Sequence, residues 1–373
     1  MQVGNGMGRR EFLRGGAGVV LGGSLLSAGC GVGQETGSEE AVKKVVPAKV
    51  DGDLLVFNWT EYMDPKLIES FEDRYKVKVR TANFDSMPSM MAKLRSGNAY
   101  DVIFPTADYV NRLVQANLLL ELDKEKLRNA ETIYPFFDNP WYDAESAHTV
   151  PYAMYTTGIA WRDDKVDGIS GSWNDLMNES AKGKVFMLDD FQEGIGQANL
   201  LNGFDLNATD PAELAQTKQT LEQQKEYLRG YSTNAAPQLL SGAAWIHHAW
   251  NGDIINTRNQ AKNKNPELYK FETCKEGIPV GSDCMAIPVN AKSPGTALLF
   301  LDWILDPVNA SQNIQYHGYP MPIEGSEDSF AELAADDPAI EVSTDDLESG
   351  SQFKELTVQE RKAWDRVWTE VKA

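Results

Sequence analysis

Short apolar strands alternate with amphipathic helices from Asp53 onward, and this order constrains the fold more than any other feature of the chain. Leu54-Leu55-Val56-Phe57 has the character of a buried strand, and Pro65 opens a helix with apolar residues at helical spacing. The alternation continues with a strand at 77–79, a helix at 89–94, a strand at 100–104 and a helix at 109–119. It predicts an α/β fold with a mainly parallel sheet covered by helices on both faces. Ligands of such folds bind where the strands end and the next helices begin.

A second α/β region follows the first, with strands predicted at 183–188 and 243–250 and helices at 173–181, 211–228 and about 295–314. Between the regions the chain passes twice through extended stretches, at 150–152 and 279–288. Two crossings predict two lobes joined by a hinge. We expect lobe 1 to comprise 51–153 and 284–345, lobe 2 to comprise 154–283, and 346–373 to form a C-terminal segment and helix that is assigned to neither lobe. Residues 324–350 are acidic and are expected to form loops.

The N-terminus resembles an export signal followed by a lipid-attachment site. Arg9-Arg10-Glu11-Phe12-Leu13 matches a twin-arginine signal, although no Ser or Thr stands before the arginines, and residues 17–26 are apolar. A span of about 20 residues is needed to cross a bilayer, so this run indicates a cleaved segment. Small residues lead to Cys30, and 31–50 is composed as a flexible tether. We predict a signal at 1–30 and an extracytoplasmic body anchored by lipid on Cys30; a cytosolic protein with an apolar arm is the alternative.

The charge and the cysteines narrow the class of protein. The net charge is −20, which opposes binding to nucleic acid and favours cationic ligands, although it also suits solubility alone. Cys274 and Cys284 form an even pair outside the cell, so they indicate a possible disulfide, with two buried free thiols as the alternative. The four histidines have no metal-ligand spacing, and phosphate, dinucleotide and hydrolase motifs are missing from the sequence. We therefore predict a non-enzymatic protein without a metal or cofactor.

Aromatic and acidic side chains recur at the ends of the predicted strands. They are Trp59, Tyr62, Asp108, Asp190, Glu193, Trp250 and Asp253, and Asp283 lies in the second crossing. Carboxylates pair with ammonium groups, and aromatic rings attract cations and cover methylene groups. The combination suits a flexible organic polycation. Each residue also has a plainer interpretation, since an acid after a strand is often a helix cap and Trp59 could belong to the core.

Collinear motifs are similar to those of the substrate-binding proteins of spermidine/putrescine ABC transporters. The resemblance runs through Asn58-Trp59-Thr60-Glu61-Tyr62, Tyr100-Asp101-Val102, Val150-Pro151-Tyr152, Trp173-Asn174-Asp175-Leu176, Trp250-Asn251-Gly252-Asp253, Gly318-Tyr319-Pro320 and Trp368-Thr369-Glu370-Val371-Lys372. It covers about residues 53 to 372. It implies a two-lobed periplasmic-binding-protein fold of type II that closes around a polyamine.

The resemblance also implies which residues bind the ligand. Matching positions are Trp59, Tyr62, Thr106 in place of the usual Ser, Asp190, Glu193, Trp250, Asp253 and Asp283. This sequence departs from spermidine-preferring members at two positions. Asp108 stands where those members have a Tyr, and Gly281 stands where they have a Trp. The loss of two rings predicts either a wider cleft or another placement of the amines, with Asp108 as an added ligand-binding charge. Gln352 is a further candidate contact.

The predicted function is that of a monomeric extracytoplasmic receptor which delivers putrescine or spermidine to the permease of an ABC importer. Other hypotheses are a receptor for another cationic or small organic solute, an exported hydrolase, and a signalling lipoprotein. A nucleophile–base pair or a metal site would favour the hydrolase.

Overall fold

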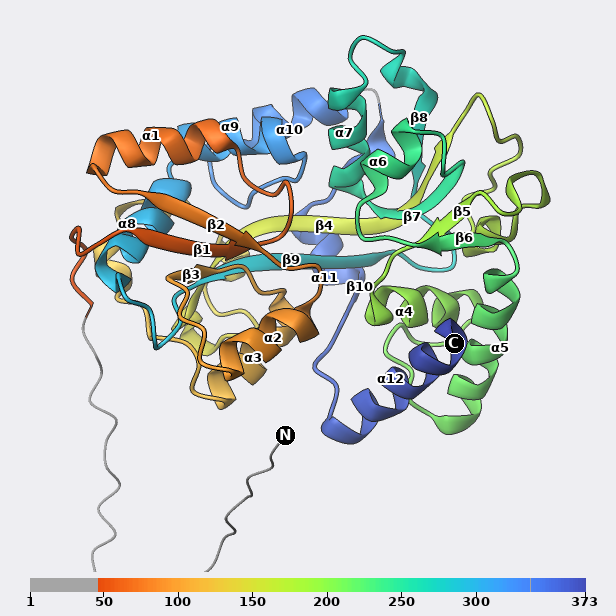
Figure 1. Cartoon of the computed structure of the whole chain (residues 1–373), viewed down its shortest axis with the longest axis horizontal. Coiled ribbons are helices and arrows are strands. Elements are labelled where there is room, and N and C mark those ends of the chain that lie inside the picture. The colour runs from red at the N-terminus through yellow and green to blue at the C-terminus, as the bar shows by residue number, and fades with distance from the viewer. Residues whose placement is uncertain (1–45, 336) are drawn as a thin grey trace, which may run out of the picture. The chain divides into compact units, whose positions relative to one another are not determined.

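The computed structural model describes residues 46–335 and 337–373 (Figure 1). The predicted signal, Cys30 and residues 31–45 of the predicted tether lie outside these residues. Within the described part, no helix combines the length and the apolar character that crossing a bilayer requires.

The described chain alternates strands and helices as the sequence predicts, but the helix predicted at 173–181 is replaced by two short 3-10 helices, Trp173–Met177 and Glu179–Ala181. The strands are β1 (Leu54–Asn58), β2 (Val79–Asn83), β3 (Val102–Ile103), β4 (Thr149–Arg162), β5 (Val185–Met187), β6 (Leu228–Tyr231), β7 (Ile246–Trp250), β8 (Tyr269–Glu272), β9 (Pro279–Ala286) and β10 (Ser351–Gln352). The helices are α1 (Pro65–Tyr75), α2 (Met87–Arg95), α3 (Ala107–Gln115), α4 (Phe191–Leu201), α5 (Pro211–Lys225), α6 (Ala235–Leu240), α7 (Asn251–Gln260), α8 (Pro294–Ile304), α9 (Pro307–His317), α10 (Glu327–Ala334), α11 (Thr344–Ser349) and α12 (Val358–Lys372).

The strands follow the order β2-β1-β3-β9-β4-β7-β5-β6, with β10 beside β9 and β8 beside β4. β1 is parallel to β2 and β3, and β5 is parallel to β6 and β7. The long strands β4 and β9 pair antiparallel between these two parallel groups, from Thr149 opposite Ala286 to Thr156 opposite Val280. The two predicted extended stretches are thus one continuous ribbon that connects the lobes.

Successive residues of the strands face two different cores. In β1, Val56 faces the core that contains α1, α8 and α9, whereas Phe57 faces the methionine-rich core of α2 and α3. In the second lobe, Val185 and Met187 of β5 pack with α4, α5 and α12. Figure 1 shows these helices on opposite faces of the sheet. Helices on both faces leave the strand ends as the free edge, where a ligand can enter.

Two predictions about the C-terminal third need correction. Pro307 divides the single helix that was expected from about 295 to 314, because Asp306 caps a new helix by accepting hydrogen bonds from the amides of Val308 and Asn309. The acidic stretch 324–350 forms α10 and α11 rather than loops only, and Ser343 caps α11 with a capping box.

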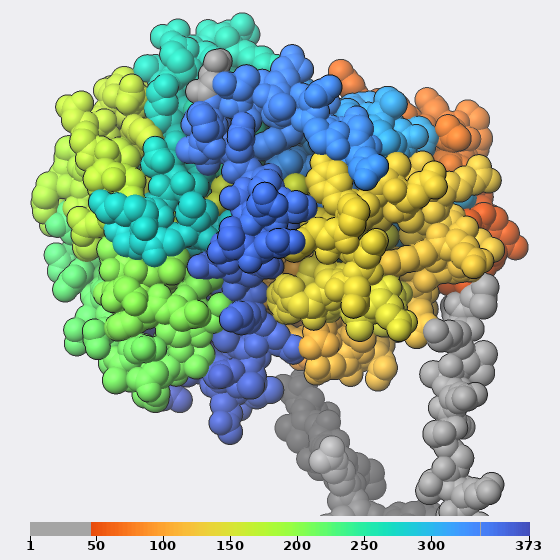
Figure 2. Space-filling view, turned by 180° about the vertical axis from the view of Figure 1, so that it is seen from behind, coloured from red at the N-terminus to blue at the C-terminus, as the bar shows by residue number. Residues whose placement is uncertain are grey.

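The C-terminal helix belongs to the second lobe, an assignment that the sequence left open. The side chain of Trp364 is fully buried in the core of α4 and α5, and its indole nitrogen donates a hydrogen bond to the carbonyl of Ala208 at 3.0 Å. In Figure 2 the dark blue C-terminal segment runs between the yellow residues of the first lobe and the green residues of the second.

The predicted disulfide is not present. Cys274 and Cys284 are both free and buried, and they belong to different hydrophobic clusters. Cys274 packs beside Trp173 and Leu200 in the core of the second lobe, whereas Cys284 lies on β9 opposite Pro151. The alternative of two buried thiols therefore describes the structure.

Candidate functional site

A cavity with an empty volume of about 1060 Å³, open to solvent, lies between the two lobes. All nine ligand-binding residues predicted from the sequence line it: Trp59, Tyr62, Thr106, Asp108, Asp190, Glu193, Trp250, Asp253 and Asp283. All but Asp283 lie near strand ends or helix starts, as the fold predicts, and Asp283 lies inside the crossing strand β9. Whether these residues contact a ligand stays a prediction, and so do the predicted lobe boundaries.

Rings of the first lobe form one wall. Trp59 follows β1, and its indole nitrogen donates a hydrogen bond to the carbonyl of Phe104 at 3.1 Å. Its ring packs against Phe84, with the centroids 4.4 Å apart. Tyr62 donates a hydrogen bond from its hydroxyl to Oδ2 of Asp283 at 2.6 Å. The hydrogen bond therefore anchors the polar edge of Trp59, and part of its ring lines the cavity. Trp59 is thus only partly buried and is not purely a core residue.

Asp108 joins the first lobe to the second. Thr106 caps α3, and its hydroxyl donates a hydrogen bond to Oδ1 of Asp108 at 2.6 Å. The other carboxylate oxygen of Asp108 accepts a hydrogen bond from the side-chain amide of Gln192 on α4 at 2.9 Å. Glu61 makes a similar contact at the cavity, where its carboxylate accepts a hydrogen bond from Asn256 at 3.2 Å.

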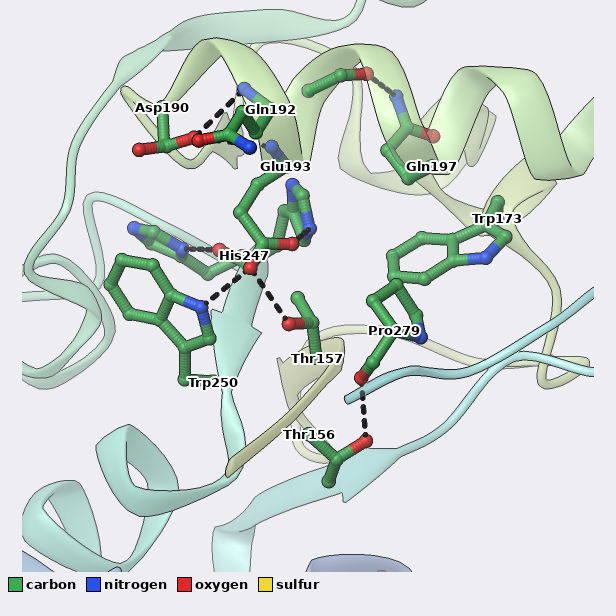
Figure 3. A network of polar contacts seen from close by, with 12 residues as sticks. Thr156, Thr157, Trp173, Asp190, Gln192, Glu193, Gln197, His247, Trp250 and Pro279 are labelled. Atoms are coloured by element: carbon green, nitrogen blue, oxygen red, sulfur yellow. Dashed lines mark hydrogen bonds and ion pairs between the residues drawn. The ribbon is translucent and has the colours of Figure 1, made fainter. Parts of the chain in front are cut away.

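The start of α4 and the end of β7 form the opposite wall. Asp190 caps α4, because its Oδ1 accepts hydrogen bonds from the backbone amides of Gln192 at 2.8 Å and Glu193 at 3.2 Å. Oε1 of Glu193 accepts hydrogen bonds from the indole nitrogen of Trp250 at 2.9 Å and from the hydroxyl of Thr157 at 3.1 Å. Figure 3 shows both donors pointing toward this carboxylate. Asp190 is thus both a helix cap and a cavity residue, whereas the sequence favours its neighbour Asp189 as the cap.

Two buried carboxylate oxygens of the cavity have no hydrogen-bond partner in the described chain: Oε2 of Glu193 and Oδ1 of Asp283. The nearest ring nitrogen to Oε2 of Glu193 is Nε2 of His248 at 3.9 Å, too far for a hydrogen bond. Burial lowers the pKa of His248 to about 3, so this histidine is neutral at pH 7 and does not balance the carboxylate. Buried carboxylate oxygens without partners are costly, and a cationic ligand would satisfy them.

The cavity is strongly acidic. Seven carboxyl groups line it, those of Glu61, Asp85, Asp108, Asp190, Glu193, Asp253 and Asp283, and the described lining residues include no Lys or Arg. Burial raises the pKa of Glu193 to about 8, of Asp253 to about 7, of Asp283 to about 7 and of Asp190 to about 6. Neighbouring carboxylates raise these pKa values further, for example Asp190 beside Glu193. Such a site stabilises added positive charge.

Groups of three or more metal-ligating side chains suited to a metal ion are not found among residues 46–335 and 337–373. The acids of the cavity are instead paired individually with hydroxyl, amide and indole donors. The arrangement offers separate anionic contacts and aromatic surfaces, which suit an extended organic cation.

Comparison with known proteins places the chain in a family. Residues 66–342 match the sequence model of a family described as bacterial extracellular solute-binding protein. The chain belongs to this family. It is 30% identical over 301 residues to the spermidine/putrescine-binding periplasmic protein of Escherichia coli K12, a match that covers 80% of this chain and 85% of the relative.

This solute-binding protein is also similar to the putrescine/cadaverine-binding protein of Pseudomonas aeruginosa, with 27% identity over 86% of this chain and 93% of the relative. Among solved structures, a putative spermidine/putrescine ABC transporter protein from Listeria monocytogenes matches with a TM-score of 0.79 and 25% identity, over 86% of this chain and 99% of that one. A Treponema pallidum lipoprotein matches with a TM-score of 0.74 and 24% identity, over 85% and 98%. The predicted two-lobed fold and the predicted family resemblance are confirmed.

The solute-binding protein has cavity residues that sequence reasoning missed. These residues are Tyr155 in the middle of β4, Tyr319 and Gln192. The ring of Tyr319 packs edge-on against that of Tyr62, with the centroids 5.3 Å apart. Gln192 donates the hydrogen bond to Asp108 described above. Tyr319 stands in a motif that carries the family resemblance, so a signal for it existed. Tyr155 gave no strand-end signal, because it lies inside a long extended run.

Two expectations drawn from the family resemblance change, one about Gly281 and one about Gln352. Gly281 does not widen the cleft, since the ring of Tyr155 fills the space above it: a Cβ atom at Gly281 would lie 2.5 Å from Cζ of Tyr155. Gln352 does not line the cavity. It lies on β10 and accepts a hydrogen bond from the indole nitrogen of Trp141 at 3.2 Å, while the next residue, Phe353, reaches the cavity.

Proposed function

We propose that this solute-binding protein holds a polyamine, putrescine or spermidine, between its lobes and delivers it to the permease of an ABC importer. The observation that carries the proposal is the pair of buried, unpartnered carboxylate oxygens of Glu193 and Asp283 in a cavity with seven acids. Two anionic contacts on opposite walls suit two ammonium groups on one carbon chain. The names of the relatives, which bind spermidine, putrescine or cadaverine, support the same class of ligand.

In this proposal the acids and the rings have different tasks. Asp190, Glu193, Asp253 and Asp283 bind the ammonium groups through charge-assisted hydrogen bonds. Trp59, Tyr62 and Trp250 cover the methylene groups between them. Tyr62 also positions Asp283 by donating a hydrogen bond to its Oδ2, which leaves Oδ1 for the ligand.

Binding that bridges both walls favours the closed arrangement of the lobes, because the ligand contacts both walls only there. A micromolar dissociation constant corresponds to about 8 kcal/mol. A few desolvated ion pairs and ring contacts can supply this free energy after the costs of ordering the ligand.

The extracytoplasmic location is part of the proposal. The twin-arginine sequence, the apolar run and Cys30 support export and a lipid anchor, and relatives are described as periplasmic. A monomeric body on a tether would stay beside its permease. Washing of membranes with high salt, followed by immunoblotting, tests the anchor: the wild type should stay with the membrane and Cys30→Ala should be released.

A thermal-shift panel of putrescine, spermidine, spermine, agmatine and amino acids tests the ligand class. A ligand present at 100 times its dissociation constant stabilises the folded protein by about 2.7 kcal/mol. We expect a marked rise in Tm with putrescine or spermidine and none with neutral amino acids. A rise with agmatine or an amino acid alone would reject the polyamine in favour of another small organic solute.

A further inference from the structure

A close contact between the two crossing strands shapes the floor of the cavity. Tyr155 on β4 lies directly opposite Gly281 on β9 in the antiparallel ladder. A Cβ atom at position 281 would lie 2.5 Å from both Cζ and Oη of Tyr155, closer than real Cβ atoms approach other heavy atoms. A side chain at this position would therefore have to displace the outer end of the tyrosine ring, which glycine leaves in place.

The ring of Tyr155 is placed among the acids that are proposed to bind the ligand. Tyr155 is half-buried and lines the cavity. Burial raises the pKa of its phenol above the usual value, and the charges of Asp283, Glu193, Asp108 and Asp190 raise this pKa further. The ring therefore lies within electrostatic range of carboxylates on both walls. Asp283, which has an unpartnered oxygen, is two residues from Gly281 on the same strand.

Tyr155 is also held by a rigid element, because β4 pairs along its length with β9 and then with β7. A ring on a paired strand cannot follow the ligand as a loop residue would. It therefore gives the cavity that Glu193 and Asp283 also line a surface of fixed position, past which a carbon chain joining two ammonium groups would run.

We propose that Tyr155, admitted by Gly281, is a specificity-determining residue that selects the ligand by the length of its carbon chain. This inference rests on the proposed polyamine function and adds the surface on which the methylene groups lie. The ring attracts cations and covers methylene groups, so a diamine whose chain spans the ring while its ends reach both acids binds best.

The test is calorimetry with propane-1,3-diamine, putrescine and cadaverine on the full mature chain. We expect Tyr155→Ala to weaken the best diamine by about tenfold or more and to reduce the differences among the three diamines to about threefold or less. Tyr155→Phe keeps the ring and should change affinity by less than about threefold.

Gly281→Ala provides an independent test, since the added methyl group must displace the ring. It should weaken binding in the wild type by about fivefold and have almost no further effect on Tyr155→Ala, because the ring is then gone. Gly230→Ala in β6 is the matched control, as its Cβ would meet only Phe186, at an ordinary 3.6 Å.

The outcomes separate the two proposals. A wild type that binds neither spermidine nor any of the three diamines rejects the polyamine function and this inference together, and one that binds spermidine alone rejects only this inference. A wild type that binds the diamines, with unchanged affinity and length preference in Tyr155→Ala or with unchanged affinity in Gly281→Ala, rejects the role of Tyr155 alone. Where Tyr155→Ala does not fold, as judged by its Tm, the Gly281→Ala and Tyr155→Phe results decide.

Discussion

Oδ2 of Asp108 accepts a hydrogen bond from the side-chain amide of Gln192 at 2.9 Å, across the cavity from α3 to α4. A second contact, between Arg361 on α12 and the hydroxyl of Tyr109 at 3.3 Å, also joins α3 to the second lobe. Asn111 continues the row by donating a hydrogen bond to Glu355 at 2.6 Å. Asp108, Tyr109 and Asn111 of α3 therefore all make side-chain contacts with the second lobe or the C-terminal segment.

Replacing Gln192 should open the ligand-free protein. Gln192→Ala removes the donor to Asp108, and Gln192→Glu places a second carboxylate against it, so the radius of gyration measured by small-angle X-ray scattering should rise in the order wild type, Ala, Glu. Gln315→Ala is a matched control, because Gln315 donates to the carbonyl of Ser329 on an exposed surface of the first lobe. An unchanged radius in both Gln192 variants would contradict a role of this contact in closure.

Removing an anchor on either wall should weaken polyamine binding. Trp250→Ala deletes a ring of the cavity and the donor to Glu193, and Asp283→Ala deletes an anionic contact, so calorimetry should show losses of about tenfold or more in each. Trp141→Ala serves as the control, since Trp141 is 51% exposed and lies outside the cavity lining. Unchanged affinity in both cavity variants would remove the site assignment.

Polyamine affinity should fall as the pH falls from 8 to 5.5. Four acids of the cavity have pKa values of about 6 to 8 and are therefore partly protonated in the ligand-free site: Asp190, Glu193, Asp253 and Asp283. An ammonium ligand binds the ionised form of these acids, so binding releases protons. Each linked proton weakens binding by about tenfold per pH unit below its pKa. Calorimetry in buffers of different ionisation enthalpy counts the protons, and Glu193→Gln should release fewer.

The same pKa shifts act on the stability of the ligand-free protein. The native carboxyl groups bind protons more tightly than unfolded ones, whose pKa is about 4, so this part of the stability is present at low pH and is lost as the pH rises through about 6 to 8. The rise in Tm produced by a polyamine should consequently be larger at pH 8 than at pH 5.5. An equal rise at both values, with no proton release, would contradict the linkage.

Trp364→Ala should destabilise the second lobe by about 3–5 kcal/mol, as expected for a large buried side chain. The fully buried indole packs with α4 and α5 and donates to the carbonyl of Ala208. Urea denaturation measures the loss, and Val358→Ala on the same helix is the control, because Val358 is 69% exposed. A change in free energy of unfolding below about 1 kcal/mol would mean that α12 is only loosely attached.

The residues of the cavity were predicted from the sequence better than the elements of the C-terminal third of the chain. Trp59, Asp190 and Trp250 were found because strand ends of an α/β fold converge, and convergence needs only the order of the elements. Tyr155 could not be found in this way, since its place depends on the register that sets it opposite Gly281. Which residues of two distant strands lie opposite each other depends on the tertiary structure and cannot be derived from a single sequence.

Other errors have local causes. The acidic composition of 324–350 hid two short helices, whose stability depends on packing of residues such as Phe330 and Leu347 rather than on a long apolar period. Gln352 was chosen because a Gln near the C-terminus contacts the ligand in some members of the family, but it lies on β10 outside the cavity lining, and Phe353, the residue after this strand, lines the cavity instead.

The pairing of β10 with β9 adds a third strand to the connection between the lobes and so limits how this connection can deform. Ser351 and Gln352 pair with Pro279 and Val280, so the third passage of the chain runs along the ribbon that β4 and β9 already form. A three-stranded ribbon bends readily out of its plane but resists sliding of its strands, because sliding would break the ladder of hydrogen bonds. Under the proposed function, the lobes would therefore close mainly by bending of this ribbon, and the closed protein would present the same surface to the permease in each transport cycle.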